Sequence, residues 1–153
     1  MTGWRIGYVG GPESIIKGMK KIQSQSTSNA SSMAQAAAVA ALDGDQTYIK
    51  ESTGIFKERH DFVLKSLQAI DGINCLASEG TFYSFPDMNG LIEKLDGINN
   101  DIELAEFFLE KAEVAMVPGS AFGAPGCMRI SFATSMENLE KSMERIKAAL
   151  ESN

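Results

Sequence analysis

The stretch Met128-Arg129-Ile130-Ser131-Phe132 alternates between large apolar and polar side chains, which predicts a strand with one buried face. Met128, Ile130 and Phe132 fall on one face, and Arg129 and Ser131 fall on the other. A guanidinium on a central strand is costly unless an anion meets it, and its fork geometry suits a carboxylate or a phosphate. The residues alone leave three interpretations open for Arg129: an anion site, a structural ion pair with a protein carboxylate, or exposure on an edge strand.

The elements around this strand predict an α+β domain over residues 45–153. A long helical pattern over 46–70 is of a length that suits a helix joining two domains. Further predicted strands are 74–77, 81–86 and 114–117, and the last of these enters a glycine-rich loop over 118–126 that fits a wide hairpin connection. Predicted helices cover 91–95 and 101–113, and a closing helix starts at a possible capping box, Thr134 to Glu137. We therefore expect a small, antiparallel-rich sheet flanked by helices.

Residues 1–44 contain one predicted strand, over 4–9, and two predicted helices, over 13–22 and 33–42. In that strand Arg5 would share a face with Gly7, which leaves room beside the guanidinium. A single strand cannot satisfy its own hydrogen-bond ladder. We therefore expect this segment to rely on a sheet supplied elsewhere, and otherwise to rearrange, pair with another chain or fray.

Composition excludes several classes of function. Among 153 residues, 14 are Lys or Arg and 20 are Asp or Glu, and the net charge of −6 disfavours a nucleic-acid or anionic membrane surface. No apolar run is long enough to span a membrane, and no secretory signal is recognisable. Two separated cysteines, Cys75 and Cys127, favour a reducing, cytoplasmic location. One histidine and no cysteine pair argue against a metal site.

The other candidate side chains are weaker. Arg59 and Arg145 lie in charged helical stretches that predict solvated faces, and His60 has no nucleophile or second histidine nearby in the sequence. Phe82 and Tyr83 would lie on opposite faces of their strand, so that one belongs to the core and the other lines a cleft.

Several short motifs of the sequence resemble those of one enzyme family: the fold-type-I, pyridoxal-phosphate-dependent aminotransferases of class I/II, the aspartate aminotransferase group. The motifs that carry the resemblance occur in the same order as in the family and cover essentially the whole chain. They are Met1-Thr2-Gly3-Trp4-Arg5-Ile6-Gly7-Tyr8, Ser26-Thr27-Ser28-Asn29, Gly80-Thr81-Phe82-Tyr83, Val117-Pro118-Gly119-Ser120-Ala121-Phe122-Gly123 and Met128-Arg129-Ile130-Ser131-Phe132.

The resemblance implies a role for five residues. Arg5 matches the arginine that binds the cofactor phosphate, and Arg129 matches the arginine that holds the substrate α-carboxylate. Phe82 matches an aromatic residue on the substrate side of the cleft. Ser28 and Asn29 match a stretch at the dimer interface that approaches the neighbouring subunit's site, which implies a homodimer.

The resemblance also implies that catalytic parts are missing from this chain. In the family the Schiff-base lysine precedes the arginine that Arg5 matches, at a position that would fall before Met1, so no catalytic residue is assigned here. The chain then corresponds to an α/β family's C-terminal part: residues 1–44 as a remnant of the large cofactor-binding domain, and 45–153 as the small domain with the interdomain helix over about 45–70. We expect the isolated chain to bind no cofactor and to show no turnover.

The full-length enzyme would transfer an amino group from an amino acid to a 2-oxo acid, most simply with an aspartate-type substrate. Some acidic-substrate members carry an arginine at the position where this chain has Ser24, so that particular arginine is absent. Two alternatives remain: another fold-type-I enzyme, either a lyase or a different transaminase, and a non-catalytic α+β domain for binding or assembly, in which Arg5 and Arg129 form structural ion pairs.

Overall fold

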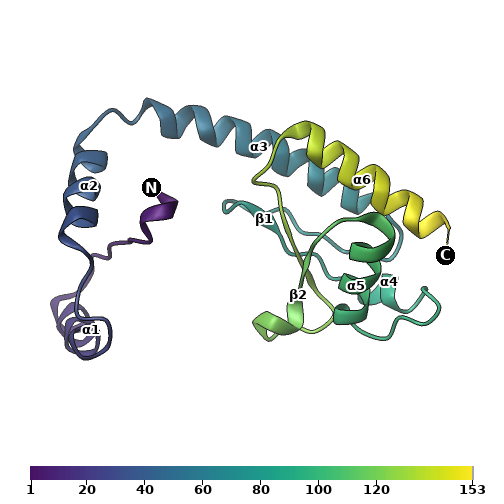
Figure 1. The fold of residues 1–153 in the computed structure, drawn as a ribbon, viewed down its shortest axis with the longest axis horizontal. Coiled ribbons are helices and arrows are strands. Elements are labelled where there is room, and N and C mark those ends of the chain that lie inside the picture. Colours follow the sequence, from purple (N-terminus) through teal and green to yellow (C-terminus); the bar gives the residue numbers. More distant parts are fainter. Residues whose placement is uncertain (153) are drawn as a thin grey trace. The chain divides into compact units, whose positions relative to one another are not determined.

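The computed structural model describes residues 1–152, which form two compact units (Figure 1). The first unit covers Met1–Lys50 and the second begins at Glu51. The first contains η1 (Thr2–Trp4), a 3-10 helix, followed by α1 (Glu13–Ser26) and α2 (Ser32–Asp43). The boundary between the units falls within a helix rather than in the loop before it.

The strand predicted over residues 4–9 is wrong. Residues 2–4 form a 3-10 turn, and Arg5 closes it with a left-handed backbone (φ 50°) whose amide donates to the carbonyl of Thr2. The physical reason is the one that made the strand doubtful: every strand in the described residues belongs to the second unit, so no ladder is available here. The predicted alternation of Arg5 with Gly7 is lost with the strand. Helix α1 also ends four residues later than the predicted end at Ile22, at Ser26.

The second unit contains most of a long helix, α3, and a small sheet with three further helices. The bounds of its elements are α3 (Thr47–Gln68), β1 (Tyr83–Ser84), α4 (Asn89–Ile92), α5 (Asp101–Ala112), β2 (Val117–Pro118), the 3-10 helix η2 (Gly119–Phe122), β3 (Met128–Ser131) and α6 (Met136–Glu151). The side chain of Ser135 caps α6 by accepting from the amide of Asn138, so the cap lies one residue after the predicted Thr134.

The sheet has the strand order β1-β3-β2, and both pairings are antiparallel. β3 is therefore central, which confirms the antiparallel sheet expected from the sequence. The strand predicted over 74–77 is reduced to a single bridge between Asn74 and Asp87. After this bridge Cys75 packs into the core and the amide of Ser78 donates to a side chain instead of to a neighbouring strand.

The core lies between this sheet and its helices, and the apolar face of β3 forms its centre. Met128, Ile130 and Phe132 are buried as predicted. Around them pack buried side chains from α3, α4, α5 and α6, among them Val63, Leu67, Leu91, Ile92, Leu104, Phe108, Leu139, Met143 and Ile146. Burial of each large side chain of this kind is worth roughly 1.5–3 kcal/mol, so the second unit has a core of its own.

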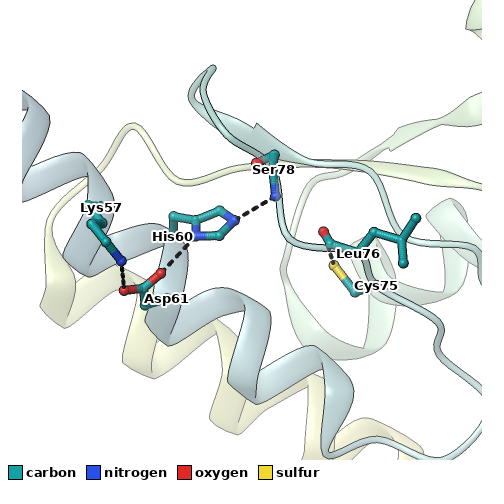
Figure 2. Close-up of polar contacts among 6 residues, drawn as sticks. All are labelled: Lys57, His60, Asp61, Cys75, Leu76 and Ser78. Carbon is teal, nitrogen blue, oxygen red and sulfur yellow. Dashed lines mark hydrogen bonds and ion pairs between the residues drawn. The ribbon is translucent and has the colours of Figure 1, made fainter.

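Two polar contacts fasten the segment that leads into β1 to helix α3. Nε2 of Gln68 donates to the carbonyl of Cys75 at 2.9 Å, and His60 makes the other contact (Figure 2). His60 is buried on α3, and its Nε2 lies 3.2 Å from the backbone nitrogen of Ser78, which donates to it. Its Nδ1 lies 3.0 Å from Oδ1 of Asp61, and the ring packs edge-on against Phe132. His60 is thus part of the scaffold of the second unit.

Within the described residues, no helix combines the length and the apolar character that a bilayer span needs.

Candidate anion-binding site

Arg129 lies on the central strand β3, on the face opposite the core. Its neighbours Met128 and Ile130 are buried, which directs the Arg129 side chain away from the interior and leaves it half-buried. Among residues 1–152 no carboxylate forms an ion pair with its guanidinium, and no hydrogen bond to it is present. The structural ion pair left open by the sequence is therefore absent for this arginine.

Two aromatic rings flank the guanidinium instead. The ring centroid of Phe122, from η2, lies 4.9 Å from Cζ of Arg129, and that of Tyr83, from β1, lies 5.8 Å away. Both distances are within the range of a cation–π contact. Because a π face consumes none of the five N–H donors, the rings orient the guanidinium while leaving its fork free for a carboxylate or phosphate.

These two rings belong to an aromatic cluster of Phe82, Tyr83, Phe85 and Phe122. Phe82 and Tyr83 meet edge to face at 5.4 Å, and Phe85 and Phe122 do so at 6.1 Å. The prediction that one of Phe82 and Tyr83 belongs to the core is wrong, since neither is buried. The strand is too short to separate the two rings: Thr81, just before Phe82, has a left-handed backbone (φ 69°), and β1 starts only at Tyr83.

Phe82 is half-exposed, and its carbonyl accepts from the amide of Phe132 at 2.9 Å. This bond fixes the backbone of Phe82 against the end of β3. The structure thus brings Phe82 to the Arg129 site through the ring of Tyr83.

Helix η2, which carries Phe122, is held by a buried carboxylate. Asp101, the first residue of α5, is 1% exposed, and its two oxygens accept from the amide and the hydroxyl of Ser120, each at 2.7 Å. Burial on its own would raise the pKa of Asp101, but the hydrogen bonds from Ser120 and from the amide of Gly126 outweigh it and lower the pKa below the usual value. The carboxylate is therefore ionised around neutral pH.

Three other residues singled out from the sequence lie in the first unit. Arg5 is exposed, and within the described chain its guanidinium has no carboxylate partner. Ser28 and Asn29 are exposed in the connection between α1 and α2, where Ser28 has a left-handed backbone (φ 63°) and donates its amide to the carbonyl of Gln23.

The remaining two arginines have protein partners. Arg145 forms an ion pair with Glu113 at 3.0 Å on an exposed surface, as expected for a solvated helix face. Arg59 is half-buried, with its Cζ 5.5 Å from the centroid of the Phe56 ring on the same helix. The described residues contain no group of three or more metal-ligating side chains.

Sequence reasoning missed Phe122, Asp101 and Ser120 as parts of this site, and it named Tyr83 only as an alternative to Phe82 for lining a cleft. Asp101 looks like an ordinary acidic residue in the first turn of a helix, and Ser120 and Phe122 lie in a loop interpreted only as a hairpin connection. The sequence offers one signal for Asp101: Asn100, directly before it, can cap the helix by itself, which leaves the Asp101 carboxylate free for another contact.

Comparison with known proteins identifies the family. The family described as "Aminotransferase class I and II" matches residues 1–146. The aspartate/prephenate aminotransferase of Nitrosomonas europaea is 53% identical over 155 aligned residues, which cover 98% of this chain and 39% of that protein. The chain therefore spans about 39% of the length of this curated relative.

Solved structures agree with this assignment. The crystal structure of the aspartate aminotransferase from Rhizobium meliloti superposes with a TM-score of 0.83 at 48% identity, covering 99% of this chain and 39% of that one. The aromatic aminotransferase from Pyrococcus horikoshii OT3 gives a TM-score of 0.82 at 35% identity, covering 99% and 40%. The match over residues 1–146 and these relatives establish that the chain belongs to the class I and II aminotransferases, with the fold-type-I architecture of that family.

Proposed function

We propose that the whole protein to which this chain belongs is an aminotransferase that moves an amino group from an amino acid to a 2-oxo acid, and that Arg129 holds the substrate carboxylate. The observation that carries the proposal is the half-buried guanidinium of Arg129, flanked by Phe122 and Tyr83 and without a protein carboxylate in the described chain. Taking an arginine partly out of water is unfavourable unless an anion meets it, and a substrate carboxylate supplies that anion.

The role of Arg129 follows from geometry. Both carboxylate oxygens of an amino acid or a 2-oxo acid can accept from the guanidinium in parallel, which fixes the orientation of the substrate as well as its position. Fixing orientation removes rotational freedom before the reaction, which is a large part of what an enzyme contributes in a two-substrate transfer. Phe82 lies next to Tyr83 and would line the substrate side of the same site.

Membership of the family implies pyridoxal phosphate in the full-length enzyme. Arg5 fits its phosphate, because it offers an exposed guanidinium without a carboxylate partner in residues 1–152. When bound, this cofactor supplies the electron sink that makes the substrate Cα–H bond acidic. We assign no lysine of this chain to the covalent link, and we propose that the chain alone shows no turnover.

We propose an aspartate-type substrate, supported by the names of the relatives, which include aspartate/prephenate aminotransferases. Ser24 stands where some acidic-substrate members carry an arginine, so the second carboxylate would be recognised by other residues. We further propose a homodimer in which the exposed residues Ser28 and Asn29 approach the neighbouring subunit's site. The free thiols of Cys75 and Cys127 fit a cytoplasmic location.

The non-catalytic alternative predicted that Arg5 and Arg129 both form structural ion pairs, and neither does so among the described residues. A different fold-type-I reaction, such as that of a lyase, would use the same carboxylate arginine. Profiling the reaction products of the full-length protein distinguishes the two reactions.

A chimera tests the proposal directly. The segment of the Rhizobium meliloti aspartate aminotransferase that matches this chain is replaced by residues 1–153, and transamination of aspartate is measured. We expect activity, and we expect Arg129→Lys to lower kcat/KM on the order of tenfold or more, since a charge-assisted hydrogen bond is worth about 1.5–3 kcal/mol. Arg145→Lys is the matched control. Equal kcat/KM values for the two folded variants would overturn the role of Arg129.

A further inference from the structure

The 3-10 helix η2 is fastened to the rest of the second unit by the Asp101 carboxylate. Oδ2 of Asp101 accepts from the backbone amide of Ser120 and Oδ1 accepts from its hydroxyl, both at 2.7 Å across 19 residues of sequence. Two bonds to one residue fix its orientation as well as its position, so Ser120 cannot turn about a single contact.

Asp101 is not needed to cap helix α5. The N-cap of α5 is Asn100, whose side chain accepts from the amides of Ile102 and Glu103. The first turn of the helix is therefore capped without Asp101. A buried carboxylate at this position costs solvation, and each of its two oxygens accepts a hydrogen bond from Ser120 of η2.

Because Asp101 holds Ser120, the position of Phe122 is also fixed. Ser120 and Phe122 belong to the same 3-10 turn, which is closed by the bond from the Gly123 amide to the Ser120 carbonyl at 3.1 Å. At its start, the Gly119 amide donates to the carbonyl of Cys127, next to β3, at 2.7 Å. The turn thus has little freedom between Asp101 and β3, and the Phe122 ring lies 4.9 Å from Cζ of Arg129.

We propose that Asp101 is a positioning residue for the Arg129 anion site, acting through Ser120 and the ring of Phe122. This inference rests on the proposed function, because it assigns Asp101 to the site that Arg129 forms. Each oxygen of Asp101 accepts from Ser120, and within the described chain Asp101 forms no ion pair with Arg129. The carboxylate therefore orients the arginine through the ring without neutralising it. The lowered pKa of Asp101 supports this arrangement, because it keeps the acceptor ionised around neutral pH.

The test uses the chain of residues 1–153 and ¹⁵N NMR spectroscopy of the arginine Nε–Hε groups. In the native chain the Arg129 signal should carry an upfield ring-current shift from Phe122, identified by its loss in Phe122→Leu. Asp101→Asn replaces an acceptor oxygen by an NH₂ donor that faces Ser120. Asp71→Asn is the matched control, because Asp71 is exposed and forms its ion pair with Lys94 at the surface.

A second pair of variants covers the case in which Asp101→Asn does not fold. Ser120→Ala removes one of the two bonds and keeps the amide bond, while Ser120→Thr keeps both. Ser120 is exposed, so the added methyl group has room. We expect Asp101→Asn and Ser120→Ala to move the Arg129 signal toward its position in Phe122→Leu, and we expect Ser120→Thr and Asp71→Asn to leave it unchanged.

Two results would overturn the inference: an Arg129 signal that stays unchanged in folded Ser120→Ala, or an equal further shift from Ser120→Ala in the Phe122→Leu background. Titration with pyruvate, a simple 2-oxo acid, separates this inference from the proposed function. If pyruvate shifts no Arg129 signal in the native chain, the carboxylate role of Arg129 fails, and with it the assignment of Asp101 to an anion site. The coupling of Asp101 to the Phe122–Arg129 contact is still decided by the variants. With binding observed, we expect Ser120→Ala to weaken it several-fold.

Discussion

Nε2 of His60 accepts a hydrogen bond from the backbone amide of Ser78 at 3.2 Å, which ties the segment before β1 to helix α3 (Figure 2). Since an amide can only donate, Nε2 must be the unprotonated nitrogen, and the proton lies on Nδ1, 3.0 Å from the Asp61 carboxylate. The neutral tautomer with the proton on Nδ1 is therefore the one that fits both contacts.

This contact predicts a difference between two substitutions of His60. His60→Leu leaves the half-buried Ser78 amide without an acceptor, whereas the longer Gln side chain can place its carbonyl oxygen near the position of Nε2. We expect His60→Leu to be less stable than His60→Gln by about 1–3 kcal/mol, the cost of a buried unpaired donor. Urea unfolding of the two variants measures the difference. Equal midpoints would show that the bond to Ser78 contributes nothing.

The Asp101 carboxylate predicts an acid dependence of stability. Burial raises the pKa of Asp101, but the hydrogen bonds from Ser120 and Gly126 lower it by more, so its pKa in the folded chain lies below the usual value of an aspartate. A carboxyl with a depressed pKa contributes stability that is present above the unfolded value and is lost as the pH falls through the folded value. The free energy of unfolding of the native chain should therefore approach that of Asp101→Asn as the pH falls below about 4.

Urea unfolding at neutral and at acidic pH checks this dependence. We expect Asp101→Asn to be less stable at neutral pH by about 1.5–3 kcal/mol, the value of hydrogen bonds to a charged group. Asp71→Asn serves as the control, because exposed ion pairs contribute little. A constant gap between the native chain and Asp101→Asn across the acidic range would contradict the assignment.

The sequence was sufficient for the parts of the fold that depend on local periodicity. The alternation around Arg129 predicted the central strand and its buried face, and the long period over 46–70 predicted α3 within a few residues of its ends. Helix α5 was likewise predictable over almost its full length. In each of these elements most of the apolar residues of the sequence pattern lie on the face that the structure buries.

The remaining differences depend on partners that periodicity does not show. A strand at residues 4–9 needs a neighbouring strand, and without one in the described chain the backbone turns at Arg5. At the site, Arg129 was singled out from the sequence, but Phe122 and Asp101 reach it through contacts between distant segments. Their local sequence is that of an ordinary loop and an ordinary helix start, so only the folded chain brings them together.

Gly119 gives a prediction about close packing at the start of η2. A Cβ at this buried position would lie 2.2 Å from the carbonyl oxygen of Ala124 and 2.7 Å from that of Cys127. Backbone must move to admit it, so we expect Gly119→Ala to lower stability by about 1–3 kcal/mol and to remove the ring-current shift at Arg129. Gly80→Ala is the control, since nothing lies within 4 Å of its Cβ. Equal stability of the two variants in thermal unfolding would contradict this packing.

Thr81 gives the last prediction, because it holds an unfavourable backbone next to the site. Its φ of 69° is in the left-handed region, which a β-branched residue rarely adopts, and Phe82 follows directly. Asn tolerates this region far better, so Thr81→Asn should raise the free energy of unfolding by about 1 kcal/mol. Thr81→Val keeps the β-branch and should give no gain. Urea unfolding of both variants decides between strain and mere local geometry: if Thr81→Asn is no more stable than Thr81→Val, the left-handed residue stores no energy beside Phe82.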